Sequence, residues 1–139
     1  MKQLCVGGVA VVLVGLIATL SAAQKPEEAA ESSAREWLAL VDSGKYAESW
    51  KEAAQFFKVN VSQEQWEKMM QGNRAPLGAV QSRKLLSATY TTSLPGAPDG
   101  EYVVIRYQSS FEHKKAAVET ATPMLDKAGR WRVSGYFIK

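Results

Sequence analysis

The last part of the chain, Val80–Lys139, reads VQSRKLLSATYTTSLPGAPDGEYVVIRYQSSFEHKKAAVETATPMLDKAGRWRVSGYFIK. Thr, Val, Tyr and Phe are frequent in it and alternate with polar residues, which is typical of half-buried β-strands. Clusters of Pro, Gly and charged residues divide it into four runs, 80–92, 101–111, 116–125 and 130–138. Connections this short join antiparallel neighbours, because parallel strands need a long crossover. We therefore predict a four-stranded antiparallel sheet.

The lengths of the turns predict how the strands pair. The Pro-Gly turn places Tyr90 opposite Val103, and a two-residue loop at 114–115 pairs Tyr107 with Thr122. One face of the sheet then collects mostly large apolar residues: Leu86, Ala88, Tyr90, Val103, Ile105, Tyr107, Phe111, Val118, Met124, Trp131, Val133 and Phe137. The other face collects mostly polar ones: Arg83, Ser87, Arg106, Gln108, Ser110, Glu119, Arg132, Ser134 and Tyr136. Such segregation indicates one covered face and one solvated face.

The preceding residues supply helices that cover the apolar face. Apolar residues recur at spacings of three and four over about 27–43, and Gly44 follows where a helix would end. A second helix is predicted over about 46–57. A third begins with a capping box formed by Ser62 and Gln65. We predict an α+β fold with three N-terminal helices on one face of a curved, cone-like, four-stranded antiparallel sheet.

Residues 1–23 have the features of a signal peptide. Lys2 is followed by an apolar run and then by Ser21-Ala22-Ala23, small residues typical of a cleavage site. We predict cleavage after Ala23, a periplasmic or secreted location, and a single α+β domain over 24–139. The alternative is an uncleaved anchor, which would be the chain's only contact with the membrane.

Composition excludes several classes of function. The chain has 17 basic and 14 acidic side chains, too even a balance for a nucleic-acid-binding protein. Its only cysteine is Cys5, so the predicted mature chain has no thiol chemistry. Its only histidine, His113, falls in a predicted turn, and no acidic residues show metal-ligand spacing. We expect no metal and no cofactor.

The chain resembles a known family in two motifs. One is Ala34-Arg35-Glu36-Trp37-Leu38, followed by Val41 to Tyr46 and by Ser49-Trp50; the other is Trp131-Arg132-Val133 with Gly135 to Ile138. Both are similar to domain-of-unknown-function family 4019, whose members are small exported bacterial proteins. The order of the elements is also similar to the nuclear-transport-factor-2-like cone fold, which usually has an extra strand among its helices. Residues 56–61 are the one candidate for that strand. The resemblance implies a fold and a compartment but no activity.

Two surfaces are candidate sites. A semi-apolar hollow under the helices would hold a ligand against aromatic and small polar side chains: Trp37, Trp66, Tyr90, Tyr107 and Thr122. The alternative for each aromatic residue is that it fills the core. The outer sheet face would hold a partner or a second copy through charged and aromatic side chains: Arg106, Glu119, Arg132 and Tyr136.

These features predict an exported, non-catalytic domain that binds a small ligand or a protein partner in the cell envelope. One alternative is a structural module that forms a homodimer through the outer face. The other is a cone-fold isomerase, lyase or hydrolase, which would need a buried carboxylate or histidine to move protons. Because the predicted register turns Glu119 outward, we expect the interior to lack such a group.

Overall fold

The computed structural model describes residues 24–139, so the predicted signal peptide lies outside the described residues. The helices are α1 (Pro26–Asp42), α2 (Tyr46–Glu52), α3 (Gln55–Asn60), α4 (Gln63–Asn73) and the short 3₁₀ helix η1 (Ala75–Leu77). The strands are β1 (Val80–Thr91), β2 (Tyr102–Phe111), β3 (Lys114–Leu125) and β4 (Trp131–Ile138). They form one antiparallel sheet in the order β1-β2-β3-β4, which confirms the predicted α+β class and meander.

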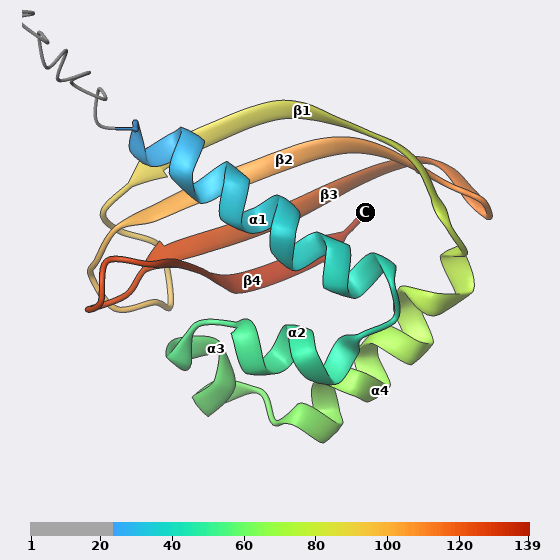
Figure 1. The fold of residues 1–139 in the computed structure, drawn as a ribbon, viewed down its shortest axis with the longest axis horizontal. Coiled ribbons are helices and arrows are strands. Elements are labelled where there is room, and N and C mark those ends of the chain that lie inside the picture. The colour runs from blue at the N-terminus through green and yellow to red at the C-terminus, as the bar shows by residue number, and fades with distance from the viewer. Residues whose placement is uncertain (1–23) are drawn as a thin grey trace, which may run out of the picture.

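The helices gather on one side of the sheet. Figure 1 shows α1 lying across the sheet, with α2, α3 and α4 grouped beyond the β4 edge. α1 contacts all four strands, and α3 contacts β4. Two start and stop signals are confirmed: Ser62 and Gln65 form the capping box of α4, and Gly44 follows α1 with φ +72°. No helix within residues 24–139 combines the length and the apolar character needed to cross a membrane.

The predicted second helix is two helices, because the chain becomes extended between them. Ala53 and Ala54 have ψ angles of 164° and 148°, and both are buried. The Ala54 N–H donates to the Val133 carbonyl oxygen at 2.8 Å, which ties the junction to β4. The residues considered for an additional strand, 56–61, are helical as far as Asn60, so the described chain has no strand between its helices.

The β1–β2 register is confirmed near the Pro-Gly turn, where Tyr90 lies opposite Val103. The β2–β3 register is wrong by three residues at Tyr107, which lies opposite Glu119; beyond an irregularity after Ser109, Phe111 lies opposite Lys114. Residues 112–113 form the turn, and the two lysines predicted as the loop are the first residues of β3. A shift by an odd number of residues exchanges the two faces of a strand. The shift therefore turns Glu119 toward the helices.

A second irregularity changes the faces of β4. Ala121 pairs with Tyr136, but Pro123 pairs with Val133, so β4 has one extra residue between these pairs. Proline has no N–H to donate to the sheet and is tolerated inside a sheet mainly at such bulges. As a result both Val133 and Tyr136 point into the core, with exposed fractions of 2% and 9%, whereas Phe137 is 49% exposed.

The core lies between α1, α4 and the covered face. Trp37 and Trp66 are buried, with ring centroids 5.8 Å apart, and Tyr136 packs edge-on against both rings. Ser49 accepts a hydrogen bond from the indole N–H of each tryptophan. Trp66 Nε1 donates to Ser49 Oγ at 2.9 Å, and Trp37 Nε1 donates to the Ser49 carbonyl oxygen at 2.8 Å. A buried donor left without a partner costs about 1–3 kcal/mol, so Ser49 fixes how α1, α2 and α4 pack together.

Candidate functional site

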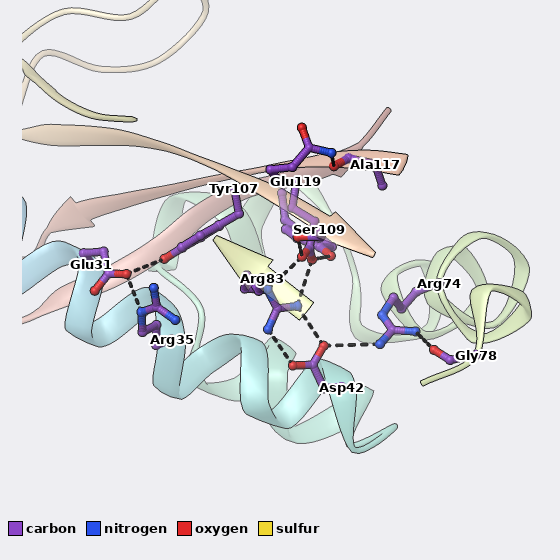
Figure 2. A network of polar contacts seen from close by, with 12 residues as sticks. Glu31, Arg35, Asp42, Arg74, Gly78, Arg83, Tyr107, Ser109, Ala117 and Glu119 are labelled. Atoms are coloured by element: carbon purple, nitrogen blue, oxygen red, sulfur yellow. Dashed lines mark hydrogen bonds and ion pairs between the residues drawn. The ribbon is translucent and has the colours of Figure 1, made fainter. Parts of the chain in front are cut away.

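A network of charged and hydroxyl side chains lies in the interior, under α1. Its members, called the interior network from here on, are Asp42, Arg74, Arg83, Ser109, Glu119 and Tyr136. Figure 2 shows Arg83 lying between Asp42 on α1 and Glu119 on the sheet, with Arg74 on the far side of Asp42.

Glu119 is the most enclosed member, with no exposed surface. The Arg83 guanidinium donates to its two carboxylate oxygens from Nε at 2.8 Å and from Nη2 at 3.1 Å. Ser109 Oγ donates to Glu119 Oε1 at 2.5 Å, and the Tyr136 hydroxyl donates to Oε2. Four donors thus surround the two oxygens, which uses about all the positions a carboxylate can offer.

Arg83 and Arg74 balance the buried Glu119 and the half-buried Asp42. Arg83 donates to Asp42 from Nη1 at 2.8 Å and from Nη2 at 3.0 Å, and Arg74 Nη2 reaches Asp42 Oδ1 at 3.2 Å. Arg74 also donates to the Gly78 carbonyl oxygen at 2.6 Å, and its guanidinium carbon lies 4.5 Å from the centre of the Phe111 ring. Two cations therefore meet two anions, as buried charges require.

The local electrostatics hold the protons of the network in place. Burial raises the pKa of the Tyr136 hydroxyl, and the neighbouring Glu119 charge raises it further. Burial alone would lower the pKa of Arg83, but its hydrogen bonds to Asp42 and Glu119 outweigh that effect and raise it. A phenol and a guanidinium that hold their protons this firmly are poor proton donors near neutral pH.

Two open grooves lie beside the network, and Tyr136 is the one network residue that lines either of them. The larger, about 700 Å³ and called the α1–β4 groove, runs between α1, α2 and the start of β4. Trp37 and Trp131 line it together with side chains of both charges: Glu36, Glu48, Lys51, Glu52, Arg130 and Arg132. The smaller, about 440 Å³ and called the Met69 groove, lies between α4, η1 and the ends of β3 and β4. Glu119 lines neither groove.

Residues 33–136 match a family described as "Protein of unknown function (DUF4019)". The chain belongs to the DUF4019 family. This confirms the family resemblance seen in the sequence, whereas the nuclear-transport-factor-2-like fold stays a prediction. No curated protein matches the chain.

The DUF4019 fold brings three of the five predicted ligand-binding residues together. Trp37, Trp66 and Tyr107 belong to one buried cluster, and Trp37 also lines the α1–β4 groove. Tyr90 lies outside that cluster: it is 37% exposed, and its hydroxyl donates to Glu101 at 2.9 Å. Thr122 is half-buried opposite the β4 bulge, where its carbonyl oxygen accepts a hydrogen bond from Ser134.

The four residues predicted for an outer partner surface do not share one face. Glu119 and Tyr136 are enclosed in the interior, so their placement on the outer face is wrong, for the reasons of register given above. Arg132 is half-buried and binds Asp126 in the β3–β4 turn and Glu52 at the end of α2. Of the four, only Arg106 is exposed. Dimerisation through the outer face stays a prediction with less support from the geometry.

Sequence reasoning missed two members of the network that matter most. Arg83 was assigned to the outer face but lies opposite the buried Ser109 and is 12% exposed at its side chain. Asp42 ends α1 and was not singled out. One signal was present in the sequence: Ala117, Ala121 and Pro123, which are small residues, share one face of β3 with Glu119 because they lie two or four residues from it. Small side chains there leave room for a long charged one.

The chemistry open to this DUF4019 domain follows from these contacts. His113 lies in the β2–β3 turn with a 63% exposed side chain, as predicted. No group of three or more metal-ligating side chains occurs within the described residues. The expectation that the interior lacks an ionisable group is wrong, because Glu119 is enclosed behind Tyr136, which packs on Trp37 and Trp66. Its four donors make it an ion-pair anchor between sheet and helix.

Proposed function

We propose that this domain acts in the cell envelope by binding, without catalysis, and that the α1–β4 groove is its binding site. The observation that carries the proposal is that, within the described part of the chain, charged side chains in the interior are paired, whereas several around the groove are not. The interior acids are fully paired with arginines, whereas the charged side chains around the groove include several without an ion-pair partner within residues 24–139: Glu36, Glu48, Lys51 and Arg130.

The size and lining of the groove support a ligand of moderate size. Its volume of about 700 Å³ lies within the range of about 300–1,000 Å³ typical of ligand sites. The half-buried Trp131 supplies aromatic surface beside the 5% of Trp37 that is exposed, while Glu48 and Lys51 on α2 supply opposite charges on the same rim. Aromatic surface flanked by both charges suits a peptide-like ligand that carries an ammonium or guanidinium group and a carboxylate.

The test is a ligand-induced change in stability. The unfolding midpoint of the mature domain is measured with fractions of an envelope extract separated by size and charge, because a ligand of the native state must raise it. We expect a peptide-containing fraction to raise the midpoint of the wild type. The double variant Glu48→Lys/Lys51→Glu should lose the increase, and Glu64→Lys, an exposed change on α4, should keep it. No increase with any fraction contradicts the proposal.

A second candidate, a cone-fold enzyme, is favoured by one observation, the enclosed carboxylate of Glu119. Such an enzyme would need its substrate to displace Arg83 or Tyr136 from the carboxylate. Wild type and Glu119→Gln are therefore compared on panels of esters, dehydratable alcohols and enolisable ketones. Turnover by the wild type that the folded Gln variant lacks would establish the enzyme and replace the binding proposal.

A further inference from the structure

The Met69 groove has a different chemistry from the α1–β4 groove. Its floor is apolar and is formed by Met69, Met70, Leu77, Tyr136, Phe137 and Ile138. Two large apolar side chains are notably open to solvent, with Met69 46% and Phe137 49% exposed. They lie at one site although they come from α4 and β4, so they form a patch and are not scattered single residues. A contiguous exposed apolar patch commonly marks a binding site.

The polar residues of this groove carry one sign of charge. Lys114 and Lys139 line it, with Asn73 as the remaining polar side chain, and no Asp or Glu lines it among the described residues. Neither lysine forms an ion pair within residues 24–139. Lys139 Nζ lies 5.8 Å from the centre of the Phe137 ring, so its charge stands beside the apolar floor. The groove is complementary to an anion joined to an apolar group.

We infer that the Met69 groove binds a single-chain anionic amphiphile, with its hydrocarbon chain over Met69 and Phe137 and its carboxylate between Lys114 and Lys139. The volume of about 440 Å³ is within the usual range for ligand sites. Methionine side chains are flexible and polarizable, which lets the floor adapt to a hydrocarbon chain. This inference does not rest on the α1–β4 groove.

The contributions of the ligand's carboxylate and of its hydrocarbon chain are tested separately with small probe molecules. Dodecanoate is titrated below the concentration at which it forms micelles, and binding is followed by calorimetry and by the increase in unfolding midpoint. We expect dodecanoate to bind, dodecanol to bind at least about tenfold more weakly, and dodecyltrimethylammonium and acetate to give no measurable binding. Equal binding of dodecanol and dodecanoate, or no binding of dodecanoate, would overturn the inference.

Matched variants locate the site. Lys114→Glu combined with Lys139→Glu should weaken dodecanoate binding at least about tenfold, because two attractions become repulsions. Lys115→Glu makes the same change on the next residue of β3, where Lys115 Nζ binds Gln81 at 2.8 Å and does not line the groove, and should bind like the wild type. Equal weakening by both sets would place the anion elsewhere.

Two further results distinguish the source of the amphiphile and the role of the floor. Met69→Glu changes an exposed side chain, so the domain should fold, and dodecanoate binding should be lost. Vesicles of anionic phospholipid are tested in parallel. Binding to vesicles without binding to free dodecanoate would replace the inference with a membrane-surface site.

Discussion

Glu119→Ala removes the residue on which the interior network is built. The change leaves Arg83, whose side chain is 12% exposed, with Asp42 as its remaining acidic partner, and leaves Ser109 and Tyr136 without their acceptor. Removing one member of a buried ion pair costs about 3–5 kcal/mol. Because Arg83 keeps two bonds to Asp42 and some contact with water, we expect the lower part of this range, about 3–4 kcal/mol.

The assay is chemical denaturation at neutral pH followed by tryptophan fluorescence. The control is Glu112→Ala in the β2–β3 turn, where the side chain is 54% exposed and the expected change is below about 0.5 kcal/mol. The double variant Glu119→Leu/Arg83→Met should regain most of the lost stability, since replacing a buried pair by apolar residues is often neutral. A loss below about 1 kcal/mol for Glu119→Ala would refute the claim that this carboxylate is an enclosed anchor.

Three further predictions follow from single contacts. Burial and the charge of Glu119 raise the pKa of Tyr136, so the folded state keeps the hydroxyl proton at a pH where the unfolded chain loses it. The unfolding free energy should therefore fall as pH rises above about 10. Tyr136→Phe should show a shallower fall in alkaline denaturation curves. Ser49→Ala removes the acceptor of Trp66 Nε1 and should cost about 1–3 kcal/mol by urea denaturation; an unchanged midpoint would reject this bond. Gly78→Ala should lower the thermal midpoint more than Gly96→Ala does. Both glycines have φ +76°, but only at Gly78 would an added Cβ meet another residue, at 2.9 Å from Glu112 Cβ. Equal thermal midpoints for the two variants would contradict this.

Much of the fold could be predicted because local signals determine it. The stripe of α1, the Ser62 capping box and the Pro-Gly turn each act over a few residues, and all three predictions are confirmed. The break between α2 and α3 could not be read in the same way. The break depends on the backbone hydrogen bond from the Ala54 N–H to the Val133 carbonyl oxygen, and these two residues are far apart in the sequence.

The outward placement of Glu119 was wrong because strand register is sensitive to a single turn. Lys114 and Lys115 were predicted to be a two-residue loop, yet Lys114 is the first residue of β3 and pairs with Phe111. The predicted register placed Val118, Met124 and Phe137 on the covered face, but Val118 and Met124 are half-buried on the outer face, and Phe137 is 49% exposed. Folded proteins leave many apolar atoms on their surfaces, so the apolar character of these residues did not determine their face.

The register of β2 and β3 decides whether Glu119 is enclosed, and disulfide formation measures it directly. The predicted mature chain has no cysteine, so any intramolecular disulfide must join the two cysteines that are introduced. Opposed residues in an antiparallel sheet are close enough for a disulfide. Gln108 lies opposite Val118, whereas the register expected from turn length would place it opposite Ala121. Gln108→Cys/Val118→Cys should crosslink under mild oxidation, and Gln108→Cys/Ala121→Cys should not; the reverse result would contradict the enclosed network.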